Sequence, residues 1–150
     1  MPTIEIVCVE QAQPLELPEF SFALRSENEP ISHRGLFYEE LKNLKGCIYH
    51  LGNPDQRGRG EGFYYASDLL NWRLDEYDRL KFLPQFVSEI QGLLANLLEA
   101  SPVQTLIFSS DYQFGPNIVR RYKRPLTYEK FWQKHEAEEL WLNARYFIIP

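Results

Sequence analysis

The feature that most limits how this chain can fold is an apolar stripe in residues 83–98. Its members recur three or four positions apart and share one helical face: Leu83, Phe86, Val87, Ile90, Leu93, Leu94, Leu97 and Leu98. Pro84 suits the first turn of a helix, and Pro102 cannot continue one. The spacing therefore predicts a long helix that either begins at Pro84 or is kinked there, and that ends at Pro102. Its broad apolar face must be buried against another layer.

The other apolar runs are shorter, and several alternate with polar residues as strands do. Strands are predicted over residues 3–10, 19–27, 47–51, 63–66, 103–109 and 144–150, and further helices over 36–46, 68–80 and 128–142. Thr127 is predicted to cap the last of these helices. Strands that are partly adjacent and partly separated by helices predict an α+β fold: a mixed, largely antiparallel sheet with three to four helices packed on it. With 150 residues and no linker-like segment, residues 1–150 are predicted to form a single domain.

The charge of the chain is negative and unevenly distributed. The net charge is −5, and residues 1–40 contain eight glutamates against Arg25 and Arg34. An acidic N-terminal region repels nucleic acid and anionic membranes and favours basic partners, although it also serves solubility alone. The N-terminus lacks the pattern of a secretory signal, and no apolar run is long enough to span a bilayer. Cys8 and Cys47 lie in apolar runs, which indicates buried, reduced thiols and a cytoplasmic protein.

Residues 52–62 form the most unusual segment, with four glycines and two arginines, Arg57 and Arg59. A dinucleotide fingerprint would need glycine at position 63, where Phe63 stands, and a helix where the following residues indicate a strand. A P-loop would need a lysine, and none lies between Lys45 and Lys81. Two interpretations remain: a mobile hairpin loop, or a loop that binds an anion or a partner through its arginines.

No pattern of catalytic or metal-binding residues is complete. Cys47 and His50 are three residues apart, so on a strand their side chains point to opposite faces and form no dyad. A partner for either one across the fold, such as His33 or His135, stays open. The histidines and cysteines have no metal-ligand spacing; His135 and Glu139 are one helical turn apart but lack a third ligand. Neither a metal nor a cofactor is predicted.

Two further segments offer candidate contacts. Asp111 and Tyr112 are predicted to follow the end of a central strand, where ligands often bind, although the same residues also suit a plain turn. Arg120 and Arg121 belong to a basic run around Tyr122. That run is predicted to pair with the acidic N-terminal region, within one molecule or across a homodimer, or to lie free in solvent. A nucleic-acid site is the weakest alternative, because the protein as a whole is acidic.

Two hypotheses about function follow. The first is a non-enzymatic protein-interaction module of the adaptor, inhibitor or immunity type, which binds another protein or a second copy of itself. It is favoured by the acidic N-terminal region and by 22 aromatic residues (10 Phe, 9 Tyr and 3 Trp). The second is a small enzyme or small-molecule site around Asp111, Tyr112, His50 and the 52–62 loop. This second hypothesis gains if Asp111, His50 and Arg57 or Arg59 line one cleft.

Overall fold

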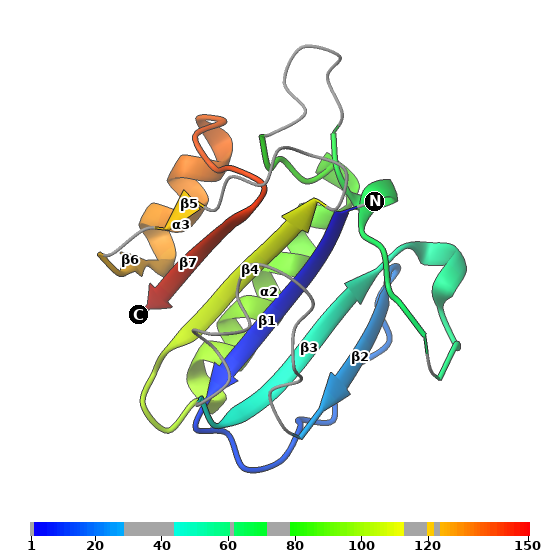
Figure 1. The fold of residues 1–150 in the computed structure, drawn as a ribbon, viewed down its shortest axis with the longest axis horizontal. Helices are drawn as coiled ribbons and strands as arrows, with labels where there is room; N and C mark the ends of the chain where they lie inside the picture. The colour runs from blue at the N-terminus through cyan, green and yellow to red at the C-terminus, as the bar shows by residue number, and fades with distance from the viewer. Residues whose placement is uncertain (1, 29–43, 61, 72–78, 113–119, 122–123) are drawn as a thin grey trace.

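Figure 1 shows one twisted sheet with a long helix lying across its rear face. The computed structural model describes residues 2–28, 44–60, 62–71, 79–112, 120–121 and 124–150. The strands are β1 (Pro2–Val9), β2 (Ala23–Glu27), β3 (Gly46–Gly52), β4 (Leu106–Tyr112), β5 (Arg120–Arg121), β6 (Leu126–Thr127) and β7 (Ala144–Ile149). The helices are α2 (Pro84–Ala100) and α3 (Tyr128–Glu136), with the 3-10 turns η1 (Pro54–Gln56) and η2 (Ser67–Leu69).

The sheet is mixed and largely antiparallel, as predicted. The strands lie in the order β2-β3-β1-β4-β7-β5, and β6 also pairs with β7. The four pairs β2–β3, β3–β1, β1–β4 and β4–β7 are antiparallel. Strands β5 and β6 run parallel to β7. The sheet is therefore mixed and largely antiparallel, as expected for an α+β fold.

The main core lies between α2 and the rear face of the sheet (Figure 1). The predicted apolar stripe is the buried face of α2, which begins at Pro84 as expected. It packs in one cluster with alternate residues of the central strands, among them Ile4, Ile6 and Phe108. Burying a side chain of this size contributes roughly 1.5–3 kcal/mol, so this layer dominates the stability of the fold.

The prediction of three to four helices is wrong for the described residues, which contain two α-helices. Most of the helix expected over 36–46 lies outside the described residues. The helix expected over 68–80 is replaced at its start by η2, after which Leu70 forms an isolated bridge with Phe82. Leu69 and Leu70 are both buried. The turn and bridge bury both leucines at the sheet end, and residues 72–78 lie outside the described part.

The strand predicted over residues 63–66 is also wrong, because a side chain replaces the expected partner strand. The Gln56 side-chain amide donates to the Phe63 carbonyl at 2.7 Å, and its oxygen accepts from the Tyr65 amide at 2.9 Å. The same oxygen accepts from the Asn53 amide at 3.2 Å. The described residues of the 52–62 segment are therefore organised by one buried glutamine rather than by a hairpin ladder.

Candidate protein-docking groove

A groove runs between α2 and α3. The Tyr128 hydroxyl donates a hydrogen bond to the Gln91 carbonyl at 2.9 Å and joins the two helices. Two hollows of about 530 and about 800 Å³ meet at this contact, since Tyr128 and Glu129 line both. We call them together the helix groove. Its helical walls are Gln91, Ala95, Leu98 and Glu99 on α2 and Tyr128, Glu129, Trp132, Gln133 and Glu136 on α3.

Helical periodicity places these residues along the groove. On α2, Gln91, Ala95 and Glu99 are four residues apart and therefore lie on one flank. On α3, Gln133 follows Glu129 by four residues and Glu136 follows Gln133 by three, so these three side chains also lie on one flank. Because alanine is the smallest of the α2 wall residues, the centre of that wall leaves room between the helices.

The floor of the groove is apolar and fixed. Leu98 and Trp132 are each only 6% exposed, and Trp132 packs edge-on against Phe131 with ring centroids 5.3 Å apart. Tyr128 is partly buried, and burial raises the pKa of its hydroxyl. The hydroxyl therefore stays protonated and keeps donating to Gln91 at neutral pH. An apolar floor between polar walls is the arrangement found in protein interfaces.

The charge on the groove is negative. Glu99, Glu129 and Glu136 line it, and no lysine or arginine of the described residues does so. Lys81 reaches Glu136 from outside the groove, with 3.6 Å between its Nζ and the carboxylate. The pKa of Glu136 is lowered, first by its hydrogen bond with His135 and then by Lys81, so this carboxylate is ionised at neutral pH.

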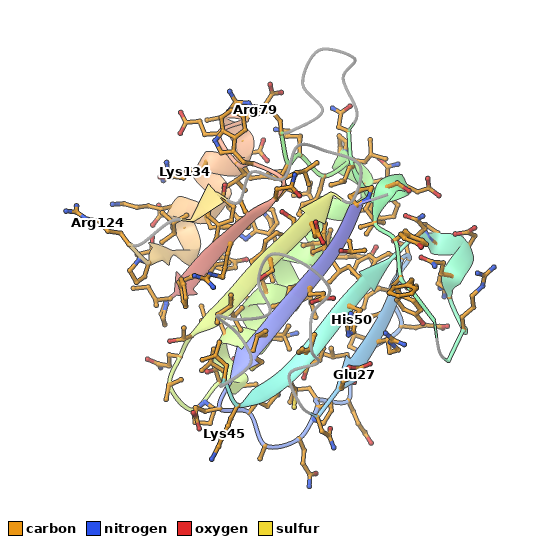
Figure 2. The ribbon with its side chains drawn as sticks, in the orientation of Figure 1. Glu27, Lys45, His50, Arg79, Arg124 and Lys134 are labelled. Atoms are coloured by element: carbon orange, nitrogen blue, oxygen red, sulfur yellow. The ribbon has the colours of Figure 1, made fainter. Side chains whose placement is uncertain are left out.

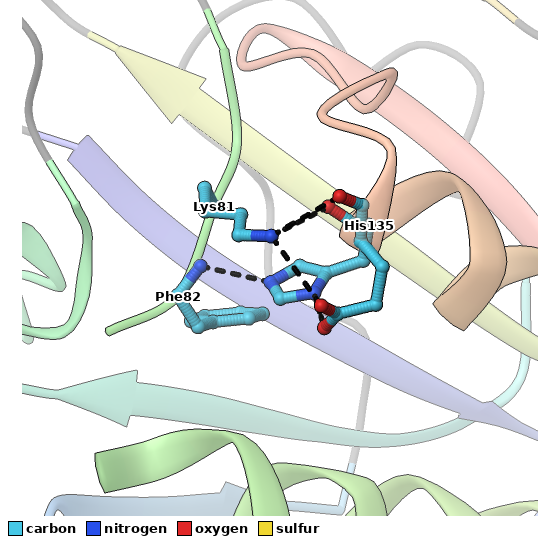
Figure 3. Close-up of polar contacts among 4 residues, drawn as sticks. Lys81, Phe82 and His135 are labelled. Atoms are coloured by element: carbon cyan, nitrogen blue, oxygen red, sulfur yellow. Dashed lines mark hydrogen bonds and ion pairs between the residues drawn. The ribbon is translucent and has the colours of Figure 1, made fainter. Parts of the chain in front are cut away.

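Helix α3 is held in place at both ends. At its start the Thr127 hydroxyl accepts from the Lys130 amide at 3.1 Å, which confirms the predicted cap. Near its end the Phe82 amide donates to Nε2 of His135 at 3.0 Å, as Figure 3 shows. The Lys81 ammonium donates to the carbonyls of His135 and Glu136 at 3.3 and 3.4 Å. A cation at these last carbonyls stabilises the helix end.

His135 is buried and neutral. Its Nε2 must accept from the Phe82 amide, so the proton lies on Nδ1, 3.1 Å from the Glu136 carboxylate. Burial lowers the pKa of the imidazole, and the hydrogen bond to Glu136 offsets part of that effect. Because Nε2 is already occupied and the residue is fully buried, His135 and Glu139 are not arranged as two open metal ligands.

The arginines predicted in the glycine loop lie apart from the helix groove. Arg57 pairs with Glu19 at 3.1 Å, and both side chains are substantially exposed. Arg57 also lines a hollow of about 330 Å³ together with Leu24 and Tyr49, which face the same side of the sheet as α2. Arg59 is exposed, and its carbonyl accepts from the Tyr64 hydroxyl.

Asp111 and Tyr112 lie within β4 and not in a loop after it, which corrects the predicted strand end. The register places Asp111 opposite Thr3, and His50 opposite Glu5, two residues further along β1. Asp111 and His50 therefore share the front face of the sheet, with β1 between them. The hollow beside Arg57 opens from the other side, so the structure does not bring Arg57 to His50 and Asp111.

Arg120 and Arg121 form the short strand β5, in which Arg121 lies opposite Arg145 of β7. The side chains of Arg120, Arg121 and Tyr112 are not among those that the structure describes. The pairing of the basic run with the acidic N-terminal region therefore stays a prediction.

A polar row that was not predicted from the sequence crosses the front face of the sheet. Successive register partners from β2 to β7 are Arg25, His50, Glu5, Ser109 and Arg145. Nδ1 of His50 lies 3.5 Å from the Glu5 carboxylate, and its Nε2 lies 3.7 Å from Glu27 on the neighbouring strand (Figure 2). The alternation of side chains along each strand could have shown which residues share a face. Only the order and register of the strands place these particular residues next to one another.

The cysteines lie on the opposite face from that row, and both are buried, as predicted. Cys8 and Cys47 are register partners on β1 and β3, and both are free and fully buried. Cys8 Sγ donates to the Leu97 carbonyl at 3.2 Å. Burial raises the pKa of Cys8 to about 12, and the neighbouring Cys47 adds to this. Cys47 faces the main core whereas His50 faces away from it, so the two form no dyad.

Comparison with family models, with curated proteins and with solved structures finds no match for this chain. Within the described ranges, no helix is long and apolar enough to cross a membrane. No group of three or more potential metal ligands is found among these same residues.

Proposed function

We propose that this protein is a protein-interaction module, of the adaptor, inhibitor or immunity type, that docks a segment of a partner protein in the helix groove. The observation that carries the proposal is the groove itself. Two anchored helices leave adjoining hollows with an apolar floor at Leu98 and Trp132 and polar walls. A buried aromatic and aliphatic centre with a polar rim is the composition from which protein interfaces gain affinity.

The shape of the groove favours a polypeptide over a small molecule. Small-molecule sites enclose most of the ligand surface, whereas the helix groove is open along its length. Its α2 wall extends from Gln91 to Glu99, which is roughly 12 Å at 1.5 Å per residue. About two turns of a partner helix match this length.

Ala95→Trp tests this proposal. Ala95 is exposed at the middle of the α2 wall, so an indole there would fill the groove without disturbing the core. Asn96→Trp is the matched control, because Asn96 is its exposed neighbour on α2 and does not line the groove. Each variant is used to capture proteins from a lysate of the native cell. We expect wild type and Asn96→Trp to retain the same stoichiometric protein, and Ala95→Trp to lose it.

A protein captured equally by both tryptophan variants would contradict the groove as the docking surface. A co-purifying small molecule with no protein partner would favour the alternative function, a ligand or enzyme site that includes His50 and Asp111. If the captured protein is a second copy of this chain, sedimentation will show a dimer that Ala95→Trp dissociates.

A further inference from the structure

We infer that the segment docked in the helix groove is a basic amphipathic helix, whose lysines or arginines meet Glu99 and Glu129 while its apolar side covers Leu98 and Tyr128. This inference rests on the proposed docking function. It goes further in naming the chemistry of the partner.

The acidic and basic side chains of α3 lie on different flanks of the helix. Glu129, Gln133 and Glu136 lie along the groove, whereas Lys130 and Lys134 fall on the other flank. Lys134 is paired with Glu139, 3.6 Å away, and points away from the groove residues. A nine-residue helix with mixed charges thus presents only acidic and neutral side chains to the groove.

The α2 wall adds to the negative electrostatic potential of the groove. Glu99 is exposed and lines the hollow that Glu129 also lines. Lys81 already neutralises part of Glu136, and no described lysine or arginine lines the groove beside Glu99 and Glu129, so among the described residues the negative charge is concentrated on these two acids. Gln133 donates to the Glu129 carboxylate at 3.3 Å, which orients this acid without cancelling its charge. An acidic partner helix would be repelled here, and a basic one attracted.

The apolar floor requires that the partner be amphipathic. Leu98 and Tyr128 line the same hollow as the two acids, so a ligand with basic groups alone would leave this apolar surface uncovered. Apolar anchors at helical spacing, flanked by basic residues, satisfy both features of the groove. Because the glutamates are exposed, they mainly steer association and set its salt dependence, while the apolar contacts hold the complex.

The test uses two fluorescently labelled amphipathic peptides: one of leucine and lysine, and its counterpart of leucine and glutamate. We expect the lysine peptide to bind, and the glutamate peptide to bind at least about tenfold more weakly at low salt. Glu99→Gln/Glu129→Gln should weaken the lysine peptide by about fivefold to tenfold and reduce the salt dependence of its binding. Glu16→Gln/Asp55→Asn is the matched control, because it removes the same net charge at exposed positions outside the groove.

The two proposals fail in different ways. If Ala95→Trp abolishes peptide binding but Glu99→Gln/Glu129→Gln matches its control, the groove docks a partner without selecting basic residues, and only this inference is overturned. If the control weakens binding as much as the groove variant, the attraction is general and the inference is again overturned. If Ala95→Trp has no effect on the captured protein or on the peptide, the docking function itself fails.

Discussion

Gly92 lies in the middle of α2, where glycine is the least favourable residue apart from proline. It is exposed, and a Cβ added there would meet no atom within 4 Å. We therefore expect Gly92→Ala to raise the free energy of unfolding by about 0.5–1 kcal/mol, because alanine loses less backbone entropy on folding. Urea unfolding measures this change.

Gly46 is the counterexample that serves as a control for this prediction. Its φ is +148°, and a Cβ would lie 2.3 Å from the Cys8 carbonyl oxygen. Gly46→Ala should destabilise the protein by more than Gly92→Ala stabilises it. Equal effects of the two substitutions would contradict the backbone geometry assigned to these positions.

At the level of single residues, the sequence predicted hydrogen bonds between close neighbours in the chain but not those that depend on how a loop folds back. Thr127 could be assigned as a helix cap because the cap and its acceptor are three residues apart. Gln56 gave no comparable signal, since its contacts with Phe63 and Tyr65 depend on how the loop folds back. Hydrogen bonds in a loop can be predicted from the sequence only when the two residues are close together in the chain.

Helix α3 depends on a neutral His135, and this makes its attachment sensitive to pH. The groups that face His135 are the Phe82 amide, Lys81 and the Glu136 carboxylate. In the unfolded chain His135 binds a proton near its ordinary pKa of 6.5, whereas the folded protein binds it only at lower pH. Between these two values the unfolded state holds more protons, so stability decreases as the pH falls below 6.5.

We expect the free energy of unfolding to fall by up to about 1 kcal/mol for each pH unit in that window. His135→Gln is the comparison variant, because its amide oxygen can accept from Phe82 but does not titrate. Urea unfolding of both proteins between pH 7.5 and 5, roughly the range over which a histidine titrates, isolates the contribution of His135. An identical pH dependence in the two proteins would show that His135 is not held neutral.

Among the described elements, α2 was the most predictable and residues 63–71 were the least. An apolar stripe of period 3.6 between two prolines specifies a helix whatever lies around it. Leu69, Leu70 and Leu80 lie in the segment predicted as a helix, but in the structure they are buried at the end of the sheet, where Leu69 ends a 3-10 turn and Leu70 forms an isolated bridge with Phe82. Tertiary contacts override local preference where a segment is short.

Taken as a whole, the molecule buries both thiols at the centre of its main core, on neighbouring strands. A thiol reagent therefore reaches Cys8 and Cys47 only when the structure opens, and burial keeps the pKa of each thiol above its ordinary value. We expect slow labelling in the native state, at a rate that rises with urea in proportion to the unfolded fraction.

Both cysteines should react rapidly once the chain is denatured, which provides the reference rate. If one cysteine reacts at that rate under native conditions, the part of the sheet around it is open, and the core described between α2 and β1 is wrong.

The sequence by itself determined the long helix, the antiparallel character of the sheet, the cap of α3 and the opposite orientation of Cys47 and His50. The character of the sheet follows from the order of strands and helices along the chain. The other three features depend on a period or on a contact within a few residues, which the order of amino acids contains directly. Only the tertiary structure decided that α3 lies beside α2, that His135 accepts from Phe82, and that Arg25, His50, Glu5 and Ser109 align across four strands. These contacts join segments far apart in the chain, and their energies depend on strand order and packing rather than on local pattern.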